Sequence, residues 1–419
     1  MITGISDGAI QQRPAAHDVV IVGAGAVGMT LALALNRLSR FRVLLLEAQG
    51  PPVAMSDNRA TAAGRILALS WSSVQTLGAI GVWDALSRDA IPMTCVHVSQ
   101  QGWPGSAMLQ ARTLGLDALG WVVREPALRS ALQEAMQAAG MEVRYGVRPA
   151  GAFPGRSCIT LHLRDDSMPL TTSLLVGADG TDSSVRSMLA LPVRRRSLPQ
   201  HALVFMLRCG ADLGTMAYER FLEEGVLGVL PMGPQGAGCT YVADPQRIGH
   251  LAGLPEPLLL KAVDTMMAGR LYPEALLGVP RRFDLPWLMA QAITAPRAVL
   301  IGNAAHTLHP AAAQGFNLGL RDVAALALAL SRTQDPGEPG LLAAYAQERL
   351  ADYRQTARWL QAMLTLYGTR LPGLAMLRGI GLGVVDMVPA LGHVVSLWGM
   401  GAGRPYLPAL WQEGMQHAS

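Results

Sequence analysis

Short apolar runs alternate with helical segments through much of this 419-residue chain. Residues 18–22 and 42–46 are tight apolar runs, and residues 29–38 between them have the apolar content of a buried helix. Runs of this length, bounded by turn signals and separated by helices, are typical of buried parallel strands. Comparable runs follow at 141–145, 158–163, 170–176 and 298–301. The pattern therefore predicts an α/β fold that begins with strand, turn, helix and strand.

The pattern changes between residues 194 and 286, where longer strand-like segments are separated by turns. Segments of this kind are typical of an antiparallel sheet. The predicted strands are 201–208, 218–221, 225–230 and 238–242, followed by a helix at 257–267. We interpret this part as a substrate-facing sheet inserted between pieces of the first domain. Residues 84–120 predict only irregular or edge-strand structure.

These patterns divide the chain into interleaved parts. Residues 1–190 form the first part of one domain and include a short piece of the second domain near residues 84–120. Residues 191–286 form the antiparallel second domain, and residues 287–345 return to the first. Residues 346–419 are a helical C-terminal region.

The end of the chain, residues 371–403, is apolar and rich in Gly and Met. No unbroken apolar run in it reaches the roughly 18 residues that a membrane span needs. We favour a packed helix pair over the alternative, a patch that faces lipid or a partner protein. The second interpretation implies peripheral contact with the inner membrane.

Composition narrows the class of protein. Half of the residues are apolar and only 15% are charged, below the roughly 25% usual for globular domains. The net charge of +4 is small for this length and the arginines are scattered, so nothing points to nucleic-acid binding. The first residues show no secretory signal pattern. No Cys-x-x-Cys pair occurs, and we expect reduced, mostly buried thiols in a cytoplasmic protein, at Cys95, Cys158, Cys209 and Cys239.

The first predicted strand runs into a glycine turn with the spacing of a dinucleotide-binding motif. Gly23 makes the turn, Gly25 lets the backbone approach a pyrophosphate, and Gly28 lets the helix pack against the strand. Glu47 ends the next strand, where it can accept a hydrogen bond from a ribose hydroxyl. Because the flanking strands, helix and acid are all present, we interpret this segment as a dinucleotide site.

A second candidate site lies where residues 298–301, a predicted strand, lead through a polar loop to a helix that starts near Gly315. Asn303 offers an amide, and the helix start offers unpaired backbone N–H groups to an anionic or electron-rich ligand. Asp179 follows another buried strand, where open parallel sheets bind ligands. Arg65 contacts a phosphate or only solvates a loop; the chemistry of the segment leaves both open.

Together these motifs resemble the three flavin signatures of class A FAD-dependent aromatic hydroxylases. The implied fold is α/β and like that of p-hydroxybenzoate hydroxylase, with a Rossmann-type FAD-binding domain, an interleaved antiparallel-sheet substrate domain and a helical C-terminus. Within that group the chain is similar to the ubiquinone-biosynthesis hydroxylases. The resemblance covers roughly residues 18–358. It rests on the glycine turn with Glu47 and on the segments 65–70, 177–180, 217–221, 302–306 and 314–322.

The resemblance implies roles for individual residues around FAD. Arg124 reaches the phosphate or ribose region, Asp179 lies near the cofactor and the approach of the nicotinamide, and Pro310 borders the site of oxygen activation. Asn303 stands at the position that hydrogen-bonds the ribityl chain, and Gly302 beside it is a further candidate for FAD binding. N–H groups near Gly315, Asn317 and Leu318 stabilise the negative charge of the reduced flavin. Arg65 belongs to a matching segment and is a further candidate for FAD binding.

Two positions depart from the family pattern. Asn303 stands where most relatives carry Asp, which is a feature of the 2-octaprenyl-6-methoxyphenol hydroxylase branch; an amide can still donate or accept a hydrogen bond there. Ala313 stands where relatives carry Gly, and a positive φ at that position would strain the loop over the flavin.

The implied activity is hydroxylation of a polyprenylated phenol in ubiquinone biosynthesis. NAD(P)H reduces FAD transiently, dioxygen adds to form the flavin C4a-hydroperoxide, and one oxygen passes to the ring. Alternatives are hydroxylation at another ring position or of a soluble aromatic, and a flavin-bearing assembly subunit that docks other ubiquinone-biosynthesis proteins. His306 and His309 lack further ligands at metal-binding spacing, so we interpret them as loop residues. Tyr218 and His309 are candidate general bases, and neither is decided.

Overall fold

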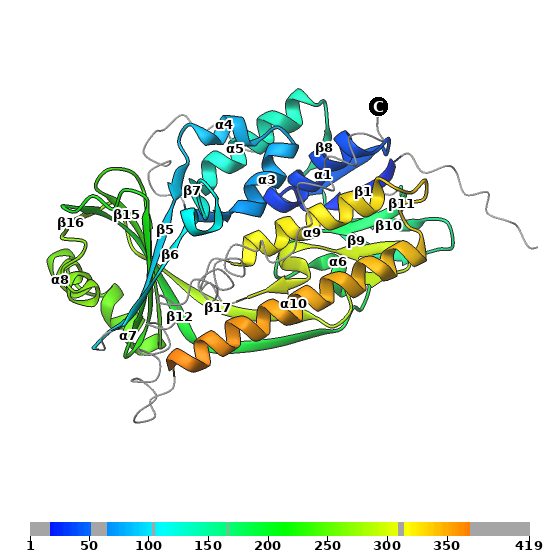
Figure 1. The fold of residues 1–419 in the computed structure, drawn as a ribbon. Helices are drawn as coiled ribbons and strands as arrows, with labels where there is room; N and C mark the ends of the chain where they lie inside the picture. The colour runs from blue at the N-terminus through cyan, green and yellow to red at the C-terminus, as the bar shows by residue number, and fades with distance from the viewer. Residues whose placement is uncertain are drawn as a thin grey trace, which may run out of the picture.

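The computed structural model describes residues 17–51, 65–102, 105–164, 166, 168–308 and 314–368. Figure 1 shows an elongated molecule with a mainly parallel sheet and its helices at one end. An antiparallel sheet backed by α7 and α8 lies at the other end. Pro310, His309 and Ala313 lie outside the described residues, as does the segment 371–403.

The first sheet has the strand order β18-β19-β11-β1-β2-β8, and β10 and β9 extend it beside β11. Strand β1 lies between β11 and β2 and is parallel to both. Its residues Val19, Val20 and Ile21 are completely buried, as the short apolar run predicted. The strands are β1 His17–Val22, β2 Val43–Glu47, β8 Glu142–Tyr145, β9 Pro149–Pro154, β10 Ile159–Leu163, β11 Leu170–Gly177, β18 Thr294–Ala295 and β19 Ala298–Leu300.

Helices pack around this sheet and share its core. Helix α1 contacts both α5 and α9, so its apolar residues are buried on almost every side. Helix α5 starts with Pro126 in its first turn and is followed by Gly140 at φ +62°, a favourable end for a helix. The helices of this part are α1 Ala26–Leu38, α5 Glu125–Ala138, α6 Ser184–Met188, α9 Gln314–Leu330 and α10 Pro339–Gly368, with the short turn η2 Gly302–Ala304.

The second sheet has the order β20-β17-β12-β15-β14-β13-β5-β6, with β16 also beside β12. One face carries a core covered by α7 Pro245–Ala252 and α8 Glu256–Met267 (Figure 1). Strands β12 and β17 are long and connect the two ends of the molecule (Figure 1). The strands are β5 Cys95–Gln100, β6 Ser106–Gln110, β12 Val193–Cys209, β13 Met216–Leu222, β14 Gly225–Pro231, β15 Gly236–Ala243, β16 Pro273–Leu276, β17 Arg281–Ala290 and β20 His306–Thr307.

A small antiparallel sheet, β3-β7-β4, connects the two large ones. Its strands are β3 Ile66–Ser70, β4 Ile91–Met93 and β7 Gly120–Arg124, with α3 Trp71–Ala79, α4 Trp83–Ser87 and the turn η1 Ala111–Leu114 nearby. The expectation of irregular or edge structure at 84–120 was wrong for β5, which pairs with β13 on one side and β6 on the other. Its parallel partner lies over a hundred residues away, so local sequence could not reveal it.

Candidate functional site

The glycine turn after β1 is shaped by backbone contacts. Gly23 has φ +107°, and a Cβ there would lie 2.5 Å from the carbonyl oxygen of Ala178. A Cβ on Gly28 would lie 2.0 Å from the carbonyl oxygen of Gly23, so helix α1 approaches the turn as closely as a glycine permits. Gly25 differs, because a Cβ there would meet none of the described residues within 4 Å. The open space at Gly25 lies at the N-terminus of α1, where an anionic group is favoured.

Glu47 closes one side of this turn. Its Oε2 accepts a hydrogen bond from the backbone N–H of Ala24 at 2.9 Å, and its Oε1 accepts from the N–H of Gln49 at 2.9 Å. The carboxylate is thus fixed beside the residue that precedes Gly25. Glu47 is only partly buried, so its remaining lone pairs can accept hydrogen bonds from a ligand hydroxyl.

Asp179 lies at the end of β11, beside the end of β1 in the parallel sheet. Its Oδ2 accepts hydrogen bonds from the N–H and Oγ–H of Ser184 and from the N–H of Val185, at 2.6, 2.8 and 3.2 Å. Its Oδ1 is buried and receives no hydrogen bond from the described residues. A buried acceptor without a donor is costly. A hydroxyl or N–H group of a bound cofactor would satisfy it.

Arg186 is a site residue that the sequence reasoning missed. It is 2% exposed and donates hydrogen bonds of 2.8 Å to the carbonyl oxygens of Ala304 and Thr181. Burial, followed by the nearby charge of Arg195, lowers the pKa of its guanidinium. It therefore joins the loop after Asp179 to the turn η2. Its position, seven residues after Asp179, could have marked it as a candidate site residue. Nothing in the sequence indicates that its guanidinium donates to backbone carbonyl oxygens.

The turn η2 holds Gly302 and Asn303. Gly302 has φ +58°, a conformation that favours glycine, and its N–H donates to Oδ2 of Asp322 at 2.9 Å. The side chain of Asn303 is exposed rather than packed into the core. The hydroxyls of Thr307, in the strand β20 that follows this turn, and of Thr181 are 3.0 Å apart, which adds a contact between β20 and the loop after β11.

Asp322, in α9, is the centre of the buried polar network behind this turn. Its Oδ2 also accepts from Nε2 of His306 at 2.8 Å, and its Oδ1 accepts from Nε of Arg349 and the hydroxyl of Tyr353, each at 2.8 Å. Asp322 and His306 are completely buried. Burial alone would raise the pKa of Asp322, but the charges of Arg349 and His306 and these hydrogen bonds hold the pKa below its usual value.

Asn317, in the first turn of α9, has its side chain hydrogen-bonded to strand β3 and helix α3. Its Oδ1 accepts from the N–H of Ser70 at 2.9 Å and from Oγ of Ser73 at 2.7 Å, and its Nδ2 donates to the carbonyl of Ala68 at 2.9 Å. The role predicted here belongs to backbone N–H groups at the start of the helix, and it stays a prediction. A Cβ on Gly315 would meet none of the described residues within 4 Å.

Arg65 and Arg124 are brought together by the small sheet. Arg65 immediately precedes β3, Arg124 ends β7, and Ile66 is directly opposite Arg124. Both side chains are exposed, and Nε of Arg65 is 3.9 Å from Oε2 of Glu125. Two neighbouring exposed arginines can bind a phosphate, which keeps the predicted role open for both.

These features fit FAD as a group. Among the described residues, the uncovered approach at Gly25, the Glu47 carboxylate, the unsatisfied Oδ1 of Asp179 and the backbone N–H groups at the start of α9 offer contacts to a pyrophosphate, a ribose and a flavin ring. All of them lie at the carboxyl ends of parallel strands or at the N-termini of α1 and α9. Residues far apart in sequence are thus arranged for one extended cofactor.

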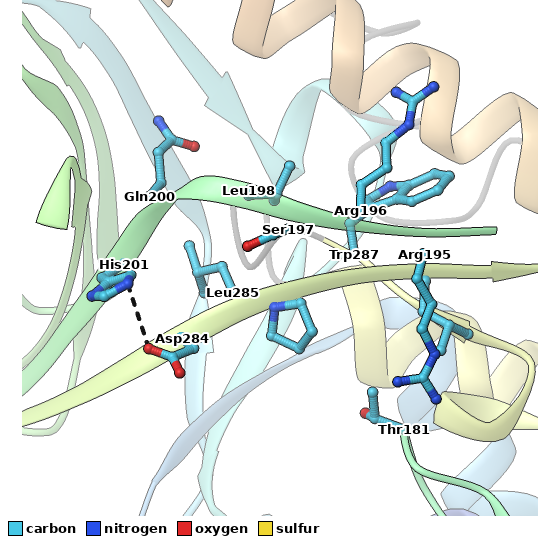
Figure 2. Close-up of a pocket in the computed structure, with 12 residues that line it drawn as sticks. Thr181, Arg195, Arg196, Ser197, Leu198, Gln200, His201, Asp284, Leu285 and Trp287 are labelled. Carbon is cyan, nitrogen blue, oxygen red and sulfur yellow. Dashed lines mark ion pairs between the residues drawn. The ribbon is translucent and has the colours of Figure 1, made fainter.

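A pocket of about 480 Å³ lies beside the loop that follows Asp179. Strands β12 and β17 pair on both sides of it, but the register shifts between Ser197 and His201. Figure 2 shows Arg195 extending toward Thr181, and Arg196 on the other side of β12 next to Trp287. The Arg196 guanidinium carbon is 5.3 Å from the centre of the Trp287 ring. The pocket combines cationic groups with an aromatic surface.

Comparison with known proteins decides the family. The FAD binding domain family matches residues 16–359. The chain belongs to this FAD-binding family. It is 29% identical over 400 residues to the 3-demethoxyubiquinol 3-hydroxylase of Escherichia coli, covering 92% of this chain and 98% of the relative. It is 28% identical over 397 residues to the ubiquinone hydroxylase UbiL of Rhodospirillum rubrum, covering 92% and 89%.

The solved structure of p-nitrophenol 4-monooxygenase from Pseudomonas putida has a TM-score of 0.73 with this flavoprotein. The match covers 92% of this chain and 98% of the other chain. Because the two sequences are only 16% identical, it shows similarity of fold alone. The predicted fold class, FAD as cofactor, and the assignment to FAD-dependent hydroxylases of the ubiquinone-biosynthesis family are confirmed. Within the described residues, no helix is both long and apolar enough to cross a membrane.

Proposed function

We propose that this flavoprotein hydroxylates the aromatic ring of a polyprenylated phenol in ubiquinone biosynthesis, with dioxygen as co-substrate. The observation that carries the proposal is the similarity to ubiquinone hydroxylases over about nine-tenths of the chain, joined to a site whose residues fit FAD. The 2-octaprenyl-6-methoxyphenol branch indicated by Asn303 stays a prediction, as does membrane contact through residues 371–403.

The residues of this chain bind and orient, and FAD when bound would supply electron transfer and activation of dioxygen. Gly25 and the start of α1 would hold the pyrophosphate, and Glu47 would hold the ribose. Arg186 and Asp322 fix the turn that presents Asn303. Backbone N–H groups at the start of α9 would favour negative charge on the reduced ring.

The test is extraction of quinones and their precursors from cells lacking this protein, with mass detection. We expect ubiquinone to disappear and a polyprenylated phenol short of one oxygen to accumulate, with recovery on return of the wild-type gene but not of a Gly25→Val form. Accumulation also identifies the ring position. Unchanged ubiquinone in cells without a second hydroxylase would contradict the proposal and favour a soluble aromatic substrate. Restoration by the Gly25→Val form, shown to be free of FAD, would favour an assembly role.

The pocket between β12 and β17 suits the reductant, because arginines bind phosphates and indole rings stack on aromatic bases. We expect Arg196→Ala to raise the KM for NAD(P)H roughly tenfold, the equivalent of one charge-assisted hydrogen bond, while kcat changes little. Steady-state oxidation of NADH and NADPH measures this. Arg282→Ala is the matched control, because Arg282 is an exposed arginine on β17 outside the pocket. Equal KM values for NAD(P)H in the two variants would contradict binding of the reductant in this pocket.

A further inference from the structure

Strand β13 presents alternate side chains to two different surroundings. Tyr218 packs against the core that α7 and α8 cover. Arg220 points the same way, because its Nε donates to the carbonyl of Met266 in α8 at 2.6 Å. Since successive side chains on a strand point to opposite faces, Ala217, Glu219 and Phe221 lie on the other face.

That other face meets the small sheet. Ala217 forms a buried cluster with Met93 of β4 and Val122 of β7. On the same face, a Cβ on Gly238 would lie 1.8 Å from Cδ1 of Ile66 in β3, so the sheets are in close contact. The next β3 residue on that side, Ala68, packs at the cluster and its carbonyl accepts from Asn317 in α9. The face that carries Glu219 is therefore directed toward the start of the flavin-site helix.

Among the described residues, the surroundings of Glu219 leave space beside a carboxylate for which no partner is seen. Its cross-strand neighbour on β14 is Gly228, where a Cβ would meet, among the described residues, only Oε2 of Glu219 at 3.5 Å and the carbonyl of Thr240 at 3.9 Å. Its neighbour on β5 is Val98. No hydrogen bond or ion pair from the described residues reaches the Glu219 carboxylate, yet the side chain keeps partial solvent access. Burial raises its pKa to about 7.

In the described part of the chain, few charged groups share this face. The small sheet presents the apolar residues Ile66, Ala68, Ile91, Met93 and Val122. Across the large sheet, Arg208 is paired with Glu274 at a distance of 3.1 Å, and Arg281 lies on the outer strand opposite Val204. Glu219 is thus an acid on a largely apolar surface, the arrangement expected for a group that works on a buried substrate.

We propose that Glu219 binds the hydroxyl of the phenolic ring and accepts its proton, with the ring lying over Gly228. The O–H bond of the phenol breaks, the proton passes to a carboxylate oxygen of Glu219, and the electron pair stays on the phenol oxygen. The ring is thereby made more electron-rich as it attacks the oxygen to be transferred. This inference rests on the proposed function, because it requires a phenol as substrate.

The same geometry disfavours Tyr218, one of the two candidate bases suggested by the sequence. Its ring packs in the core on the opposite face and lies 5.7 Å from the ring of His97, centre to centre. Burial raises its pKa further. A group whose pKa lies near neutrality is better suited to accept a proton than one that is rarely ionised. His309, the second candidate, lies outside the described residues.

The test compares Glu219→Gln and Tyr218→Phe in the FAD-loaded enzyme, with product formed and reductant consumed both measured across pH. Glutamine keeps the size and the hydrogen bond but cannot take the proton, so we expect hydroxylation to fall roughly 10²–10⁴-fold. Reductant consumption continues, with less product formed per reductant oxidised. In the wild type, the rate of hydroxylation should rise with pH through about 7, where Glu219 ionises. The variant should lose that rise, and Tyr218→Phe should retain it.

A stability measurement separates this role from a structural one. The folded-state pKa of Glu219 is raised, so stability contributed by the protonated form is present below the unfolded pKa and lost as pH rises toward about 7. Glu219→Gln should therefore keep its FAD and melt no lower than the wild type above pH 7. The inference would be overturned if Glu219→Gln hydroxylated the phenol at the wild-type rate, or if only Tyr218→Phe lost hydroxylation. If the wild type hydroxylates no phenol, the proposed function itself fails.

Discussion

Replacing Asp322 with asparagine is expected to lower the free energy of unfolding by about 3–5 kcal/mol, because it removes one partner from a buried ion pair. Each carboxylate oxygen of Asp322 accepts two hydrogen bonds. Oδ2 accepts from Gly302 and His306, and Oδ1 accepts from Arg349 and Tyr353. In either orientation of the asparagine side chain, its NH₂ group faces two hydrogen-bond donors and cannot accept from them. The Arg349 charge is then left poorly compensated in the interior.

The same substitution should weaken FAD binding roughly tenfold or more, the equivalent of one lost hydrogen bond to a charged group. Gly302 and His306 lie on either side of Asn303. Weakening their hydrogen bonds to residue 322 therefore makes the turn expected at the flavin less well ordered. Urea unfolding of the apoprotein and FAD titration followed by flavin fluorescence give the two numbers. Glu274→Gln breaks the exposed pair with Arg208 and should cost only ~0–1 kcal/mol, with FAD affinity unchanged. Equal unfolding midpoints for the two variants would refute the central role of Asp322.

The local parts of the fold and site could be predicted because their signals are short. The turn at Gly23 and the strand that precedes it are encoded within a few residues, and the structure gives Gly23 a positive φ. Strands β12 to β15 were predicted with ends off by a few residues, except that β12 begins well before residue 201. Its first part pairs with β17 across some ninety residues of chain, and pairing at that distance leaves no local pattern.

The parts that could not be predicted depend on long-range contacts. The role of Asn317 at the flavin stays a prediction, and the hydrogen bond between its side chain and Ser70, about 250 residues earlier, had no signal in the local sequence. From the sequence, Arg186 and Asp322 cannot be distinguished from other charged residues on helices. Their importance follows from buried hydrogen-bond partners that only the fold brings together. Glu219 lies in the 217–221 segment of the family resemblance, and nothing local in that segment indicates its chemistry. Its chemistry follows from which face of β13 it occupies.

Substitutions at Gly25 and Gly28 are expected to have opposite kinds of effect, although both glycines belong to one motif. At Gly28, the Cβ of alanine would lie 2.0 Å from a backbone oxygen, which side-chain motion cannot relieve. Helix α1 must move off the sheet core. We expect Gly28→Ala to lose about 4 kcal/mol or more, in the range that only severe packing conflicts reach, and the apoprotein to melt far below the wild type.

At Gly25, φ is −72°, an ordinary value for any L-residue, and the space around the Cβ is open. Gly25→Val should therefore leave the melting temperature of the apoprotein close to that of the wild type. It should nevertheless abolish measurable FAD binding, because the new side chain occupies the approach of the pyrophosphate to the start of α1. Calorimetry of the apoproteins and FAD titration separate the two outcomes. A Gly25→Val protein that binds FAD normally would mean that the cofactor does not approach this turn, since nothing else in the described structure fills that space.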